Sequence, residues 1–123
     1  MLLPPEPASD ASPAADKAPI FRLQHLTRAY NGRTVLNIEA LTVARGEVLA
    51  LVGPSGSGKS TLLRLLNFLE APSTGELSFD GEPVSSDPPL AQRRRVTAVF
   101  QRPALLQRSV AANIAYGVGL RGQ

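Results

Sequence analysis

The sequence predicts an α/β fold in which a mixed β-sheet is joined to an antiparallel N-terminal β-subdomain. Three observations support this fold class. First, residues 20–43 form two loosely alternating segments around Asn31-Gly32, a dipeptide typical of a tight hairpin turn. Second, residues 48–52 are apolar throughout, as in a strand that is buried on both faces. Third, a glycine-rich loop at 53–60 separates that run from a segment with helical periodicity.

The first residues of the chain predict a tail rather than a folded element. Residues 1–19 are rich in proline and alanine, and their five prolines remove backbone donors and interrupt helices. We therefore expect residues 1–19 to be disordered and residues 20–123 to form the folded part. No secretory signal is expected, because Pro4-Pro5 interrupts the short apolar segment Met1-Leu2-Leu3 at once.

A helix and a small hairpin are predicted after the glycine-rich loop. Four leucines recur at the spacing of one helix face and predict a helix over 61–69: Leu62, Leu65, Leu66 and Leu69. Asp80-Gly81 lies between the short segments 77–79 and 83–84, which predicts a hairpin. Pro83 places this hairpin at a sheet edge, because proline cannot donate to a strand ladder.

A further strand and helix are predicted near the C-terminal end. Residues 96–100 are apolar and rich in β-branched side chains, which predicts a strand. Ser109 is the expected N-cap of a helix over 110–116. Glycines 117, 119 and 122 are expected to fray the chain beyond that helix.

Composition excludes several classes of function. Hydrophobic residues make up 43% of the 123 residues and charged residues 19%, a balance typical of a packed globular domain. The absence of cysteine excludes disulfides, thiolate metal sites and cysteine nucleophiles. With one histidine, His25, a zinc site built from several histidines is hard to form. No apolar run reaches the ~18 residues that span a bilayer, so we expect a soluble chain.

The glycine-rich loop carries the clearest chemical signal. It reads Gly53-Pro54-Ser55-Gly56-Ser57-Gly58-Lys59-Ser60 and matches the phosphate-binding pattern G-x-x-x-x-G-K-[ST] in full. Its glycines let backbone N–H groups turn toward phosphate oxygens, and the following helix adds its free first-turn donors. Lys59 is the expected partner of the β- and γ-phosphates, and the Ser60 hydroxyl is the expected Mg²⁺ ligand. Thr61 is expected to donate to the α-phosphate.

Several motifs, in this order, resemble the ATP-binding subunit of an ABC transporter. They are Val48–Thr61, Leu62–Gly75, Phe79-Asp80-Gly81, Val99–Pro103 and Ser109–Ile114. The resemblance covers about 20–123 and implies the N-terminal part of an ABC-type ATP-binding domain, with a P-loop NTPase-like fold. It implies that the protein binds MgATP as the energy-coupling ATPase subunit of an importer, which powers the transmembrane transport of a solute.

The resemblance also implies roles for two residues outside the loop. Tyr30 matches the aromatic residue that stacks against the adenine ring in this family, and the simpler alternative is a tyrosine that packs at a strand end. Gln101 matches the glutamine that approaches Mg²⁺ and positions the attacking water. Gln101 is therefore the candidate catalytic residue and, with Ser60, a candidate metal ligand, and the alternative is an exposed polar residue after a strand.

The resemblance implies partners and a location. The expected partners are transmembrane permease subunits and a second ATP-binding subunit, with a substrate-binding protein as a further candidate. The expected location is cytoplasmic, peripheral on the inner face of the cell membrane. Residues 88–123 carry six arginines and no carboxylate, which can attract nucleic acid. No nucleic-acid partner is expected, because no aromatic side chain interleaves with 93–95 as a stacking platform requires.

The sequence also departs from the family pattern. It has no LSGGQ-type signature, no acidic pair at the end of a later strand and no switch histidine, since Asp87 is the last carboxylate and His25 precedes the loop. The fold is therefore expected to be incomplete, without the later strands and the helical subdomain, and to leave apolar faces uncovered on 48–52 and 96–100. Whether this chain hydrolyses ATP stays open.

Three alternatives remain at this point. The first is a nucleotide-binding module that does not hydrolyse ATP. The second is another phosphate-loop enzyme, such as a nucleotide kinase or a GTPase, although the N-K-x-D element of guanine readers is absent. The third is a soluble ABC-type ATPase that acts on nucleic acid.

Overall fold

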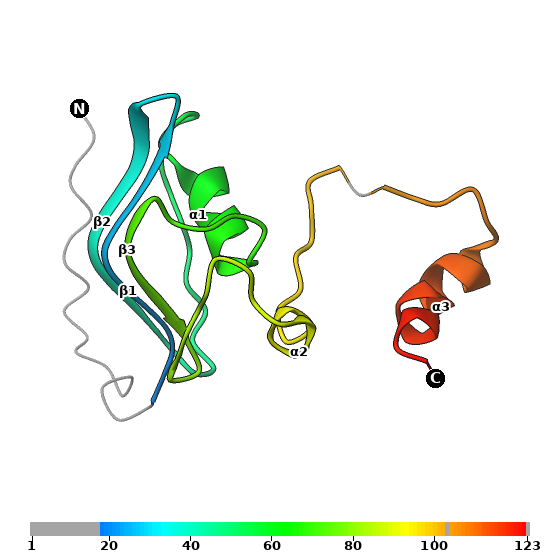
Figure 1. Cartoon of the computed structure of the whole chain (residues 1–123). Coiled ribbons are helices and arrows are strands. Elements are labelled where there is room, and N and C mark those ends of the chain that lie inside the picture. The colour runs from blue at the N-terminus through cyan, green and yellow to red at the C-terminus, as the bar shows by residue number, and fades with distance from the viewer. Residues whose placement is uncertain (1–17, 103, 123) are drawn as a thin grey trace.

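A curved antiparallel sheet with one helix packed against it forms the body of the structure (Figure 1). The computed structural model describes residues 18–102 and 104–122, so the predicted disordered tail lies, up to residue 17, outside the described residues. The strands are β1 (Pro19–Tyr30), β2 (Arg33–Ala44), β3 (Thr74–Phe79) and β4 (Glu82–Pro83). Their order in the sheet is β2-β1-β3-β4, and every neighbouring pair is antiparallel.

The two predicted turns are confirmed. Asn31 and Gly32 connect β1 to β2 with φ values of 49° and 77°, the left-handed conformation that a tight two-residue hairpin turn requires at both positions. Asp80 and Gly81 connect β3 to β4 in the same way, with φ values of 52° and 82°. In both turns the sequence supplies the residue types that tolerate positive φ.

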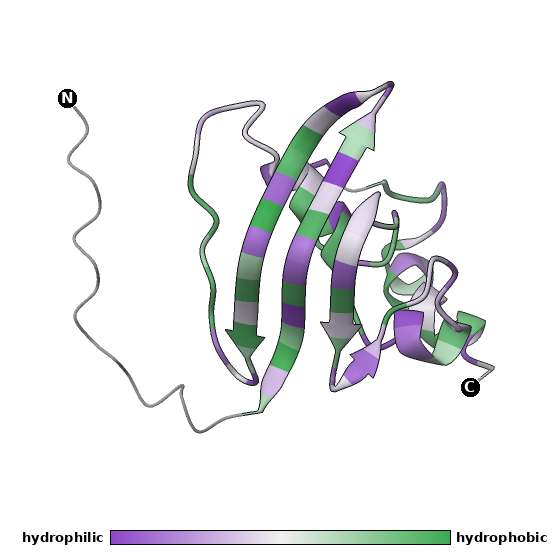
Figure 2. Ribbon diagram, turned by 60° about the vertical axis from the view of Figure 1, so that its left-hand side comes forward, coloured by the Kyte–Doolittle hydropathy of each residue, from purple (hydrophilic) through white to green (hydrophobic). Residues whose placement is uncertain are grey.

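The core lies between the sheet and helix α1 (Lys59–Leu66). Figure 2 shows hydrophobic and hydrophilic residues alternating along the strands, the pattern of a sheet with one buried face. The buried cluster takes residues from β1, β2, α1, β3 and the chain just after α1: Leu23, Leu26, Leu36, Leu62, Leu65, Phe68, Leu77 and Phe79. The single predicted helix of this region is therefore present, with its leucine face on the sheet.

Helix α1 ends earlier than the predicted 61–69. Phe68 has a left-handed φ of 57°, which stops the helical path. The Phe68 ring then packs against Phe79 and Phe21, with ring centroids 5.4 and 6.3 Å apart. Leu69 is 60% exposed, so its assignment to the buried helix face is wrong. Burial of an aromatic ring has outweighed continuation of the helix.

Two predicted strands do not join the sheet. Residues 48–52 and 96–100 have no ladder partner among the described residues, and the sheet there is antiparallel rather than mixed. Val48 and Val52 are 96% and 94% exposed, where the sequence predicted a strand buried on both faces. A strand buried on both faces needs a neighbouring strand on each side. In this sheet, β1–β4 pair only with one another. The predicted uncovered apolar faces are present.

The C-terminal part is an extended stretch with two helices, α2 (Leu90–Arg93) and α3 (Val110–Leu120) (Figure 1). Ser109 caps α3 as predicted, because its side chain accepts a hydrogen bond from the Ala112 N–H at 3.2 Å. The helix continues through residues 117–120, beyond the predicted end at 116. Within residues 18–102 and 104–122, no helix has the length and apolar character that crossing a membrane requires.

Two ion pairs at Asp80 join the turn between β3 and β4 to the chain after α2 and to the end of β2. The Asp80 carboxylate bridges Arg95 and Arg45, one through each oxygen. The hydrogen bond from Arg95 lowers the pKa of Asp80, as do the charges of Arg45 and Arg95, while desolvation opposes them. The carboxylate is therefore in its charged form near neutral pH, and both pairs are ionic.

Candidate functional site

The glycine-rich loop leads from the extended segment 48–52 into α1. Gly56 and Gly58 have φ values of 81° and 91°, a conformation that favours glycine, and Gly58 is the N-cap of α1. No side chain in the described part of the chain caps this end of the helix. Since first-turn N–H groups have no acceptor inside a helix, those of residues 59–61 are donors for a ligand.

Strand β2 fixes the position of the loop. The β1–β2 register shifts between Arg28, opposite Leu36, and Ala29, opposite Thr34, so that Val35 is the extra residue of a bulge. A Cβ on Gly58 would lie 2.9 Å from the Val35 carbonyl oxygen and 3.1 Å from Leu36 Cδ1. The loop and the bulge thus approach to a distance that only glycine permits.

Lys59 folds back across its own loop. Its Nζ donates to the Gly53 carbonyl at 2.5 Å and to the Pro54 carbonyl at 2.7 Å. A third hydrogen bond, of 3.1 Å, reaches the Ser57 hydroxyl. These contacts hold the ammonium group against the backbone of the loop.

A hollow of about 470 Å³ opens at the loop, within the size range of small-molecule sites. It is lined by Val35, Ser55, Gly56, Gly58, Lys59, Ser60, Thr61 and Gln101. Gln101 comes from a segment about forty positions farther along the chain, and the structure places it beside the loop, in the lining of this hollow. Thr61 lines the hollow although only 8% of it is exposed. The three remaining predicted loop residues, Gly53, Pro54 and Ser57, are the acceptors of Lys59.

Oxygen donors suited to Mg²⁺ lie in this hollow. Ser60 supplies a hydroxyl and Gln101 an amide oxygen, and both line the same space. Mg²⁺ prefers oxygen ligands and keeps several waters or phosphate oxygens, so a site with two protein donors fits it. Within the described ranges, no group of three or more His, Asp or Glu side chains could hold a metal ion by itself.

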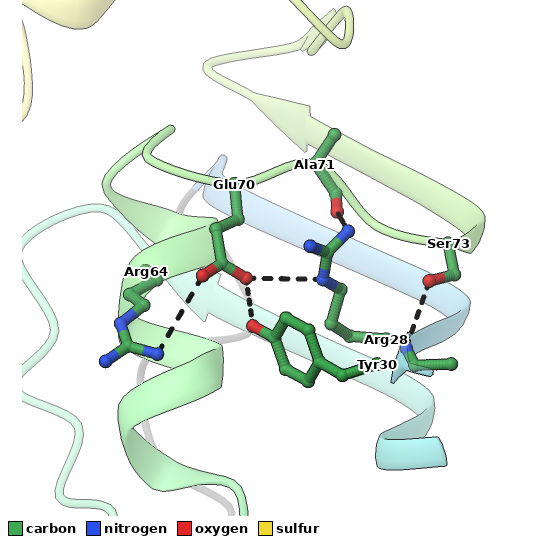
Figure 3. A network of polar contacts seen from close by, with 7 residues as sticks. Arg28, Tyr30, Arg64, Glu70, Ala71 and Ser73 are labelled. Atoms are coloured by element: carbon green, nitrogen blue, oxygen red, sulfur yellow. Dashed lines mark hydrogen bonds and ion pairs between the residues drawn. The ribbon is translucent and has the colours of Figure 1, made fainter. Parts of the chain in front are cut away.

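Tyr30 lies apart from the hollow. Its hydroxyl donates a hydrogen bond to Glu70, and the Arg28 guanidinium lies over its ring, 4.7 Å from the centroid (Figure 3). Tyr30 is not among the residues that line the hollow. It pairs with Arg33, two residues from Val35 along β2, which places Tyr30 about 7 Å along the strand from the edge of the hollow.

Sequence reasoning missed the role of Glu70. In the sequence, Glu70 directly follows the predicted helix 61–69 and is 40 residues away from Tyr30. In the structure, the Glu70 carboxylate faces Tyr30, Arg28 and Arg64 together (Figure 3). No short-range pattern signals such a contact, because it depends on how the end of α1 meets β1.

Comparison with known proteins shows similarity to ABC transporter proteins over most of the chain. A model of the ABC transporter family matches residues 36–119. The chain is 42% identical over 106 residues to ABC transporter I family member 17 of Arabidopsis thaliana, covering 85% of this chain and 40% of that protein. It is 38% identical over 100 residues to the tungstate uptake system ATP-binding protein TupC of Peptoclostridium acidaminophilum, covering 81% of this chain and 44% of that one.

A solved structure extends the comparison to the fold. The chain is similar to a bacterial Atm1-family ABC exporter with ATP bound, with a TM-score of 0.73 and 33% identity. The match covers 80% of this chain and 18% of the exporter chain. The chain thus spans less than half the length of the curated relatives that it matches. The similarity supports the incomplete P-loop NTPase-like fold expected from the sequence.

Proposed function

The chain belongs to the ABC transporter family, and from this premise we propose that it binds MgATP through residues 53–61 as an energy-coupling subunit. The observation that carries the proposal is the phosphate-loop geometry. Free helix donors, a lysine ammonium group and oxygen donors from Ser60 and Gln101 converge on one hollow. A triphosphate needs this combination of N–H donors, fixed positive charge and metal ligands.

Each residue has a separate task in this proposal. Lys59 exchanges one or more of its carbonyl acceptors for phosphate oxygens, and the N–H groups of 59–61 donate to the same anion. Ser60 and Gln101 would hold Mg²⁺, which neutralises phosphate charge when bound. Gln101 also orients the attacking water, and Tyr30 provides the stacking surface for adenine. Together these residues bind and orient the nucleotide.

Transport into the cell is the direction that the relatives favour. The tungstate relative is by its name part of an uptake system, and methionine and phosphate import proteins also match this chain at about 40% identity. We infer that residues 20–123 form the N-terminal part of an ABC-type ATP-binding domain. The proposed partners are permease subunits, a second ATP-binding subunit and a substrate-binding protein, at the cytoplasmic face of the membrane.

The test of this proposal is Lys59→Ala in the full-length protein. Removing the ammonium group should raise the Kd for MgATP at least about 100-fold, which corresponds to about 2.7 kcal/mol. Isothermal titration calorimetry measures the Kd for MgATP of the parent and of the variant. Arg22→Ala is the matched control, because it removes an exposed cation of β1 that does not line the hollow. Equal affinity of Lys59→Ala and the parent would refute the site.

One observation favours a second candidate function. Within residues 18–102 and 104–122, the side chains that line the hollow include no carboxylate, the usual base toward an attacking water. The alternative is a module that binds the nucleotide and does not hydrolyse it. A phosphate-release assay beside the titration separates the two, because binding without release is the behaviour of the module. Family membership argues against the nucleotide kinase and the GTPase.

A further inference from the structure

A polar cluster outside the phosphate loop joins β1 to the chain that follows α1 (Figure 3). The Tyr30 hydroxyl donates to Glu70 Oε2, and Arg28 Nε lies 3.2 Å from the same oxygen. Arg64 Nη1 lies 3.8 Å from the other oxygen, Oε1. The Glu70 and Arg28 side chains are only 22% and 24% exposed, so these charges are largely removed from water. Such a carboxylate holds its partners more firmly than a surface pair does.

The cluster fixes Tyr30 at two points. Its hydroxyl is bound to Glu70, and one face of its ring is covered by the Arg28 guanidinium. Arg28 is itself anchored, since Nη1 donates to the Ala71 carbonyl at 2.8 Å. The Ala29 N–H donates to the Ser73 hydroxyl at 3.0 Å and ties the same strand end to the same segment. The ring therefore has a defined orientation without any ligand.

We propose that Glu70 is a positioning residue that holds the Tyr30 ring as a preformed platform for the adenine base. The inference rests on the proposed function, in which the phosphates occupy the loop. Val35 lines the hollow and lies two residues from the partner of Tyr30, so a base can extend from the loop toward this ring. Fixing the ring in advance removes the conformational entropy that an unrestrained side chain loses when the base binds.

The test compares two ligands, MgATP and inorganic tripolyphosphate with Mg²⁺, which has the phosphates and no base. Glu70→Ala in the full-length protein should raise the Kd for MgATP about 3- to 10-fold and leave that for tripolyphosphate unchanged. Tyr30→Phe, which keeps the ring and removes only the hydroxyl, should give a loss in the same direction. Both variants break the same contact, between the Tyr30 hydroxyl and Glu70. The double variant should therefore lose much less MgATP affinity than the product of the two single losses.

Glu76→Ala is the matched control, because Glu76 is an exposed glutamate of β3 outside the cluster and should leave both affinities unchanged. If Glu70→Ala lost equal affinity for both ligands, Glu70 would stabilise the phosphate loop rather than the Tyr30 ring. That result would overturn the inference. Unchanged MgATP affinity in both Glu70→Ala and Tyr30→Phe would overturn it as well. If Glu70→Ala does not fold, Tyr30→Phe alone decides.

The same experiment distinguishes failure of the inference from failure of the proposed function. If the parent protein binds neither ligand, the nucleotide site itself is refuted, and the inference falls with it. If both ligands bind and Tyr30→Ala weakens both equally, Tyr30 is a packing residue and only the inference and the adenine platform are refuted. If Tyr30→Ala weakens MgATP alone and Glu70→Ala does not, Glu70 has no positioning role.

Discussion

At position 58 the chain requires a residue without a side chain for two independent reasons. The backbone there has a φ of 91°, and a Cβ would lie 2.9 Å from the carbonyl oxygen of Val35. At Gly56, by contrast, φ is 81° but no atom of the described residues lies within 4 Å of a Cβ placed there. The two glycines share the conformational requirement and differ in the space around them, which makes them a matched pair.

Gly58→Ala should therefore cost more stability than Gly56→Ala. The left-handed conformation costs about 1–2 kcal/mol at both positions, and the contact with β2 adds to this at position 58 alone. Urea unfolding measures both free energies. A loss of free energy at position 58 that does not exceed the loss at position 56 would show that the loop does not press against the bulge at Val35.

Individual residues of the loop could be predicted from the sequence, while the contacts of Tyr30 could not. The pattern at 53–60 is local, because the glycines, Lys59 and the start of α1 follow one another along the chain. Gln101 was predicted through the family resemblance, and the structure brings it to the loop. The Tyr30–Glu70 contact joins residues 40 positions apart and has no local signature.

Among the elements, the two hairpin turns and the start of α3 were predictable from the sequence, whereas α2 and the fate of strands that need distant partners were not. Asn31-Gly32 and Asp80-Gly81 fix positive φ by their own chemistry, so their turns form where predicted. Residues 48–52 have the composition of a buried strand, but a strand exists only as part of a ladder. The end of α1 was missed because Phe68 leaves the helix to join Phe21 and Phe79.

The packing of Phe68 gives a prediction at this scale. Phe68 is 6% exposed and Phe100 is 59% exposed, so truncation should have unequal effects. Phe68→Ala should lower the free energy of unfolding by about 3–5 kcal/mol, and Phe100→Ala by less than about 1 kcal/mol. Chemical denaturation of both variants provides the measurement. Similar losses of unfolding free energy would mean that the packing of Phe68 against Phe21 and Phe79 does not determine where α1 ends.

The molecule as a whole combines a packed half with a segment of exposed apolar side chains. The sheet, α1 and the loop share one core, whereas Val99, Leu105 and Ile114 are 96%, 80% and 78% exposed. The sequence predicted uncovered apolar faces on 48–52 and 96–100 because the family resemblance covers the N-terminal half of a domain. The fold class of the molecule was thus predictable from motif order. The arrangement of the C-terminal stretch was not, since no β-ladder among the described residues includes it.

In the proposed complex, residues 53–61 enclose the phosphates of a nucleotide. The most direct measurement is a series of ¹H–¹⁵N NMR spectra of the full-length protein, titrated with MgATP and followed at every backbone amide. The largest shifts are expected at the amides of residues 59–61, because these first-turn N–H groups become donors to phosphate oxygens. Saturable shifts confined to other parts of the chain, with these amides unchanged, would contradict the proposed complex.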